Sequence, residues 1–180
     1  MLVKENTGLI VVDVQGRLAR LVDDSQAVLD ATAKLIKGAQ ILGLPVIWLE
    51  QNPDKLGETV AEIRELLAPG QHPIQKFHFC AGTEAPFAEA IMHAGVSYWL
   101  VCGIESHICV YQTVAGLLQS GYQVEVVQDC ISSRSQANRQ LGIEKMCALG
   151  AHKTSVEMCL YELVKDCRND SFKPILQLIK

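Results

Sequence analysis

The chain has 180 residues, of which 49% are hydrophobic and 20% are charged, and its formal net charge is -4 at pH 7. This composition is typical of one globular domain, residues 1–180, and excludes a disordered protein. Because Lys and Arg are scattered and no apolar run approaches ~20 residues, neither nucleic acid nor a membrane is an expected partner.

The first half of the chain alternates apolar runs with helical patterns. Residues 8–14 form a β-branched run typical of a buried parallel strand. A helix is predicted from Asp24 or Ser25, either of which can cap it, to about Leu42, where Gly43 ends it. The next predicted elements are a strand at 45–50, a helix at 59–67 and a strand at 73–79.

The second half continues this alternation. The predicted elements are a helix at 83–94, a strand at 97–102, a helix at about 107–118, a strand at 122–128, a helix at 135–149, a strand at 153–156 and a helix at 156–166. Such an order gives βαβ units with right-handed crossovers. We therefore predict a three-layer, Rossmann-like α/β fold whose mostly parallel six-stranded sheet has helices on both faces. The apolar tail, 172–180, is expected to pack on the body or on a second subunit.

The cysteines and the N-terminal sequence bear on the cellular compartment. The seven cysteines are an odd number without a CxxC pair, so we expect reduced thiols and neither a zinc knuckle nor a dithiol redox site. The first apolar run is short and is interrupted by Asp13, unlike a signal peptide. These features predict a cytoplasmic protein.

Three polar residues of different chemistry are predicted at strand ends, where ligands bind in open α/β sheets. Asp13 ends the first strand, Lys76 lies on the third, and Cys109 begins the helix after the fourth. A helix N-terminus lowers a thiol pKa, which favours a nucleophile at Cys109. The alternatives are a packed apolar thiol, a carboxylate that binds loop N–H groups or a metal, and an edge-strand lysine that points to water.

With their local sequences, these three residues resemble the isochorismatase-like cysteine hydrolases, a family that also contains nicotinamidases and N-carbamoylsarcosine amidase. The resemblance covers nearly the whole chain, and its carriers are LIVVDVQ, PIQKFHFCAG and VCGIESHICVYQTVAGLLQSGYQVEVVQD. The GIESHICV motif is fairly specific, whereas the first-strand motif is weak by itself. The resemblance implies a triad of Asp13, Lys76 and Cys109.

The resemblance also implies a mechanism. Asp13 would take the Cys109 proton, and the thiolate would attack a small amide, ureide or imide to give a thioester, with Lys76 holding the charges in place. The N–H groups of Cys109 and of a residue in the preceding turn would form the oxyanion hole. The family has a cis peptide in that turn, and the matching bond here is Ile104–Glu105.

Departures from the family limit what this resemblance implies. Nicotinamidases have an Asp and paired histidines that bind a metal after the second strand, but this chain reads WLEQNPDKLG there and contains no HxxxH pair. We therefore expect no metal and no cofactor, and we expect His93 to be a solvated residue. Isochorismatases proper lack the cysteine and cleave a vinyl ether, so Cys109 favours the metal-free isochorismatase-domain branch.

Further residues on loops or strand ends are candidates for the substrate pocket. They are Trp48, Gln51, Phe79, Glu105, Ser106 and His107. Trp48 is equally a candidate for the core, and Ser106 or His107 for a helix cap. Arg17 and Arg20 follow the first strand and are read either as a site that attracts a substrate carboxylate or as solvated surface residues.

Two other classes of function remain open. One is a binding or scaffold protein that uses its pocket or its apolar tail for a partner. The other is a dinucleotide binder, which is disfavoured because DVQGRLAR follows the first strand in place of GxGxxG. The prediction is a hydrolase of C–N bonds with a small-molecule substrate, and the resemblance implies a homo-oligomer.

Overall fold

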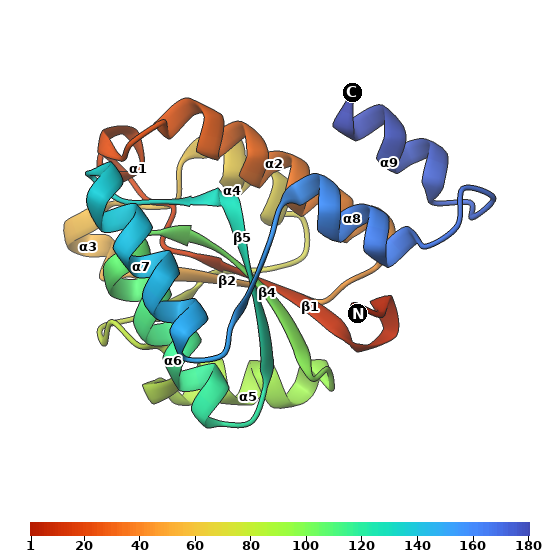
Figure 1. Cartoon of the computed structure of the whole chain (residues 1–180). Helices are drawn as coiled ribbons and strands as arrows, with labels where there is room; N and C mark the ends of the chain where they lie inside the picture. Colours follow the sequence, from red (N-terminus) through yellow and green to blue (C-terminus); the bar gives the residue numbers. More distant parts are fainter.

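The computed structural model describes residues 1–180 and contains one sheet of six parallel strands in the order β3-β2-β1-β4-β5-β6 (Figure 1). The strands are β1 (Thr7–Val12), β2 (Val46–Gln51), β3 (Ile74–Lys76), β4 (Tyr98–Ile104), β5 (Gln123–Ser132) and β6 (His152–Thr154). The strand order reverses between β1 and β4, so the sheet has its topological switch point there. The predicted six-stranded α/β fold is confirmed.

Helices cover both faces of the sheet (Figure 1). One layer contains α2 (Ser25–Leu42), α4 (Ala61–Leu67), α8 (Val156–Val164) and α9 (Phe172–Ile179), and the other contains α5 (Ala85–Ala94), α6 (Tyr111–Gln119) and α7 (Gln136–Ala148). The short elements are α1 (Leu18–Leu21), α3 (Pro53–Leu56), the 3-10 turns η1 (Lys4–Asn6) and η2 (Ala81–Thr83), and the π-helical turn η3 (Ser106–Val110). No helix is both long enough and apolar enough to span a bilayer.

Strand β1 shows why the sheet is buried on both faces. All six of its residues are buried, as its continuous apolar sequence predicts. Leu9 and Val11 belong to the hydrophobic cluster under α2 and α8, while Ile10 and Val12 belong to the cluster under α5 and α6. The same alternation in the neighbouring strands gives the protein two apolar cores separated by the sheet.

The C-terminal tail forms helix α9 and packs on the body. Ile175 is fully buried in the cluster shared with α2 and α8, and the ring centroids of Phe172 and Tyr161 are 6.3 Å apart. Packing on the body, one of the two predicted alternatives for this tail, is therefore present.

Several element boundaries differ from the prediction and affect the site. Strand β3 is only Ile74–Lys76, so Lys76 is its last residue. The helix predicted at 107–118 begins as the π-helical turn η3, and β5 continues past Gln128 to Ser132 across a register shift in its pairing with β4. Asp24 has φ 52° and its side chain caps no helix N–H, because this residue adopts the left-handed conformation.

Candidate active site

Asp13, Lys76 and Cys109 come together at the carboxyl edge of the sheet, beside the switch point between β1 and β4. Asp13 directly follows β1 and has φ 50°, a left-handed conformation that Asp tolerates better than most residues. Its N–H donates to the carbonyl of Leu49 at 3.3 Å, which fixes it against β2. Because parallel strands end at the same edge, the three side chains share one site although Asp13 and Cys109 are 96 positions apart in the sequence.

Lys76 and Asp13 form a buried ion pair. The Nζ atom of Lys76 lies 2.8 Å from Oδ2 of Asp13, and their side chains are 0% and 4% exposed. The same Nζ donates to Oε1 of Gln51 at 2.6 Å and faces the carbonyls of His78 and Phe79 at 3.3 and 3.5 Å. Oδ1 of Asp13 has no hydrogen-bond donor in the protein. The ammonium is therefore fully engaged, whereas one carboxylate oxygen is free to take a proton.

The Cys109 thiol is 8% exposed and lies 3.9 Å from Oε1 of Gln51. Burial raises the pKa of this thiol to about 12, and the nearby Asp13 carboxylate adds to the shift while Lys76 opposes it. Burial also raises the pKa of Asp13, against the charge of Lys76. The expectation of a lowered thiol pKa is thus corrected, because burial beside a carboxylate outweighs the effect of the helix N-terminus.

Gln15 positions Gln51 and was not singled out from the sequence. Its Oε1 accepts from the N–H of Gln51 at 2.6 Å, and its Nε2 donates to the carbonyls of Gln51 and Gly57 at 3.0 and 2.7 Å. Gln15 is 1% exposed. A buried glutamine must satisfy both ends of its amide, so this residue fixes the backbone at the end of β2. Its place two residues after Asp13 was the available signal.

A cavity of about 160 Å³ opens onto the thiol and is lined by 10 residues. Its polar part contains Asp13, Gln15, Gln51, Glu105 and Cys109. Its apolar part contains Leu18, Leu56, Phe79, Ile104 and Ile108. Gln51, Phe79 and Glu105, three of the predicted pocket residues, thus line this cavity.

Trp48 and Ser106 lie elsewhere. Trp48 and Gln51 stand at an odd spacing on β2, and side chains at odd spacings point to opposite faces of a sheet. The indole of Trp48 therefore lies on the other face, where its Nε1 donates to Oγ1 of Thr59 at 2.8 Å. Ser106 is fully buried and its Oγ donates to the carbonyl of Arg139 in α7 at 2.9 Å. It caps no helix, since η3 has no side-chain cap.

The remaining candidates also face away from the cavity. Nδ1 of His107 lies 2.9 Å from Oγ of Ser133. Arg20 pairs with Glu62 at 2.6 Å, and Arg17 is exposed outside the lining, so the reading of these arginines as solvated residues fits the structure.

The turn between β4 and η3 forms one wall of the site. The Ile104–Glu105 peptide bond is cis. The Glu105 carboxylate is 5% exposed and accepts from the backbone N–H and Nε of Arg134 at 2.9 and 3.0 Å. The Glu105 N–H donates to no protein acceptor. Gly142 of α7 packs directly on this turn, since a Cβ at that position would lie 2.2 Å from Oγ of Ser106.

Comparisons with known proteins agree with this fold. The isochorismatase domain model matches residues 7–158. The chain belongs to the isochorismatase family. This confirms the resemblance drawn from the sequence, and with it a hydrolase fold.

Three relatives of this isochorismatase-family chain are informative. The secreted isochorismatase effector Isc1 of Phytophthora sojae is 35% identical over 99% of this chain and 87% of its own length. The structure of MAR1 ribonuclease from Caenorhabditis elegans matches with TM-score 0.93 and 32% identity over 99% and 91% of the two chains. YcaC from Pseudomonas aeruginosa, with hexane-2,5-diol and covalent acrylamide, matches with TM-score 0.91 and 25% identity over 98% and 90%.

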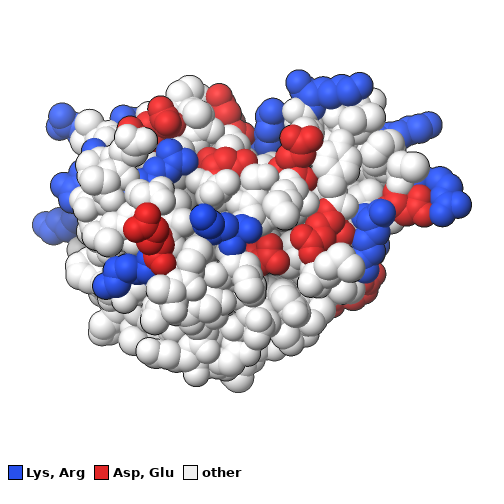
Figure 2. All heavy atoms as spheres, viewed as in Figure 1, with Lys and Arg blue, Asp and Glu red and all other residues white.

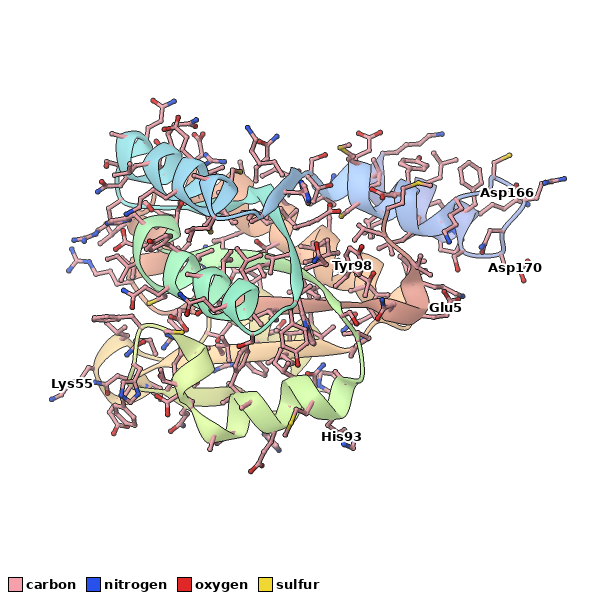
Figure 3. All side chains as sticks on the ribbon, turned by 60° about the horizontal axis from the view of Figure 1, so that its bottom comes forward. Glu5, Lys55, His93, Tyr98, Asp166 and Asp170 are labelled. Carbon is pink, nitrogen blue, oxygen red and sulfur yellow. The ribbon has the colours of Figure 1, made fainter.

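No group of three or more His, Cys, Asp and Glu side chains in this isochorismatase fold is arranged to hold a metal ion. His93 points away from the body on α5, as does Lys55 on α3 (Figure 3). A larger cavity of about 410 Å³ lies beside β2 and β3, where Trp48, Glu50 and Arg64 line it, but none of its lining residues is Ser, Cys or Lys. The smaller cavity at Cys109 is therefore the candidate active site.

Proposed function

We propose that this protein is a cysteine hydrolase that cleaves the C–N bond of a small amide, ureide or imide, with Asp13, Lys76 and Cys109 as its triad. One observation carries the proposal: a thiol at the wall of a small cavity lies beside a buried carboxylate whose free oxygen has no donor and whose other oxygen is paired with Lys76. The proposal assigns these three side chains the roles of nucleophile, base and charge partner.

The proposed reaction has two halves. In the first, Asp13 accepts the Cys109 proton, a C–S bond forms at the substrate carbonyl, and the C–N bond breaks as the leaving nitrogen takes the proton from Asp13. In the second, water adds to the thioester and gives a proton to Asp13, the C–S bond breaks, and the thiolate regains its proton. The balance is one amide and one water to one carboxylic acid and one ammonia or amine.

The high pKa of the thiol fits concerted proton transfer. A thiol whose pKa is raised to about 12 is not a standing thiolate at neutral pH, so its proton must leave as the C–S bond forms. Lys76 then stabilises the negative charge wherever it lies, on Asp13 or on the attacking sulfur. The backbone N–H groups of Cys109 and Glu105 are the proposed oxyanion hole, and the lack of any acceptor for the Glu105 N–H supports this role.

The experiment is a screen of primary amides, ureides and imides for release of ammonia. The proposal predicts turnover that is lost in Cys109→Ala and retained in Cys147→Ala, a half-buried cysteine of α7 outside the site. Added hydroxylamine should divert the thioester to a hydroxamate. An equal loss of turnover in Cys109→Ala and Cys147→Ala, or turnover that yields no hydroxamate, would contradict a thioester at Cys109.

Hydrolysis of RNA is the competing function, because a ribonuclease is among the relatives. Two observations favour the amide reading: the net charge is -4, and no cation lines the cavity. Lys and Arg on the face in Figure 2 are interspersed with Asp and Glu rather than gathered in a stripe. Cleavage of a labelled RNA that Cys109→Ala abolishes would favour the ribonuclease. A binding or scaffold role would be favoured if no amide or RNA is turned over.

The expected cytoplasmic location and homo-oligomeric state are part of the proposal. Light scattering after gel filtration tests the second of these, with a mass of at least twice 19.8 kDa expected.

A further inference from the structure

We propose that the cavity at Cys109 selects substrates whose acyl group is uncharged and apolar, and that it rejects those that carry a carboxylate or phosphate close to the reacting carbonyl. This inference rests on the proposed function, because it names the substrate class of the same site.

The charges around the cavity carry the inference. None of the lining residues is Lys, Arg or His, and the titratable carboxyls among them are Asp13 and Glu105. An anionic group in the cavity would lose water, find no cation and face two acidic side chains. The site is therefore electrostatically unsuited to an acid as substrate.

The nearby cations do not change this conclusion. Lys76 is 0% exposed and is not part of the lining, since its ammonium faces Asp13, Gln51 and two carbonyls. Arg134 directs its Nε to the Glu105 carboxylate while its side chain is 60% exposed, outside the cavity. Both of these cations are thus committed to protein carboxylates before any substrate arrives.

The apolar wall supplies the attraction for an uncharged acyl group. Leu18, Ile104 and Ile108 are partly or fully buried in the wall, while Leu56 and Phe79 are 40% and 52% exposed at its outer part. Contact with these side chains removes apolar groups of the substrate from water, which favours binding. A short aliphatic or aromatic acyl chain matches this lining.

A matched pair of alkylating reagents tests the charge preference without knowledge of the substrate. Iodoacetamide and iodoacetate differ mainly in an amide against a carboxylate. In each, the Cys109 sulfur forms the S–C bond, iodide leaves, and the thiol proton passes to Asp13. Rates at Cys109, read by peptide mass spectrometry, are divided by the rates for a small thiol in solution. We expect the normalised rate for iodoacetamide to exceed that for iodoacetate by about tenfold or more, since burial of an unpaired charge is costly.

The variant Leu56→Lys places a cation at the mouth and should raise the normalised iodoacetate rate several-fold. Leu149→Lys is the control, because this leucine is 50% exposed at the end of α7, at the opposite edge of the sheet, and should change neither rate. If Cys109 is alkylated fast and its normalised rates with the two reagents are about equal, the inference is overturned while the proposed function stands. If Cys109 reacts slowly with both reagents, the proposed function fails instead.

Turnover gives a second readout on the wild-type protein. Butanamide and 4-amino-4-oxobutanoate have similar size and differ in the terminal methyl or carboxylate. The inference predicts a larger kcat/KM for butanamide, by about tenfold or more. An equal or larger kcat/KM for the anionic amide would overturn it.

Discussion

The Nζ atom of Lys76 lies 2.8 Å from Oδ2 of Asp13, and both side chains are almost completely removed from water. Such a pair gains little net stability over apolar residues, but the loss of one partner leaves the other charge buried. Each residue therefore depends on the other to balance its charge, and the site depends on both.

Lys76→Met should destabilise the protein by about 3–5 kcal/mol at pH 8. The loss should be smaller at pH 5, because burial without Lys76 raises the pKa of Asp13 further and the folded variant then binds a proton that the unfolded chain has released. The stabilisation by this bound proton is complete below the pKa of Asp13 in the unfolded chain, near 3.8. It is lost as the pH rises through the higher pKa of Asp13 in the folded variant. Urea unfolding at several pH values measures this. A loss of equal size at pH 5 and 8 would contradict it, and Asp13→Asn/Lys76→Met, which contains neither charge, is the control.

Gln51→Leu should lower kcat while KM changes little. The variant removes the 2.6 Å acceptor of Lys76 and the 2.8 Å donor to the carbonyl of Phe77, so the ammonium loses its fixed place beside Asp13. Hydrogen bonds to charged groups contribute about 1.5–3 kcal/mol, which corresponds to a loss of about tenfold to hundredfold in rate.

If Gln51 has a purely structural role, Gln51→Leu should be less stable but should keep the acid limb of its profile of kcat against pH at the wild-type position. A positioning role should also move that limb, because burial raises the pKa of Asp13 and Lys76 opposes this rise. Gln40→Leu is the matched control, since its Nε2 donates to the carbonyl of Leu66 far from the cavity.

Glu84→Gln should loosen the segment whose carbonyls face Lys76. Its Oε1 accepts from the N–H groups of Phe77 and His78 at 2.9 and 3.1 Å, and these hydrogen bonds lower the pKa of Glu84 to about 2. The stabilisation by Glu84 is present above pH 4.5 and is lost as pH falls through about 2. We expect Tm to fall by about 2–4 °C at pH 7 and by less at pH 3. A difference that grows on acidification would contradict this.

Gly142→Ala should displace the turn of Cys109. A Cβ there would lie 2.2 Å from Oγ and 2.6 Å from the backbone of Ser106, so η3 or α7 must move. Overpacking of this kind costs about 1–3 kcal/mol, and we expect activity to fall more than stability does. Gly82→Ala is the control, because its new Cβ would meet only the Cys80 sulfur at 3.5 Å. Full activity in Gly142→Ala would show that η3 tolerates the displacement.

The fold and the places of Asp13, Lys76 and Cys109 could be predicted because strand periodicity and the βαβ order put strand ends at one edge. For Gln15 the sequence offers only its place two residues after Asp13, because its role depends on its contact with the end of β2. For Trp48 the sequence predicts either the pocket or the core, because its position along β2 says how near the strand end it lies and leaves open which face it occupies. The structure shows the core alternative. Both faces of a buried parallel strand are apolar, so sequence alternation gives no sign of the face.

The thiol pKa was unpredictable for a different physical reason. A helix N-terminus is visible in the sequence, but the degree of burial of Cys109 and its approach to Asp13 are set by tertiary packing. The register shift between β4 and β5 and the π-helical turn are likewise departures from regular geometry that hydrophobic periodicity does not reveal.

The most direct test of Cys109 as nucleophile with Asp13 as base is the iodoacetamide rate of each cysteine between pH 5 and 9 in the wild type and in Asp13→Asn. We predict that Cys109 reacts fastest at pH 7 and at a nearly constant rate from pH 6 to 8, whereas an ordinary thiol gains about tenfold per pH unit below its pKa. In Asp13→Asn that plateau should disappear and the rate at pH 7 should collapse. If Cys109 reacts no faster than the exposed Cys167, or if Asp13→Asn leaves its rate unchanged, the account is contradicted.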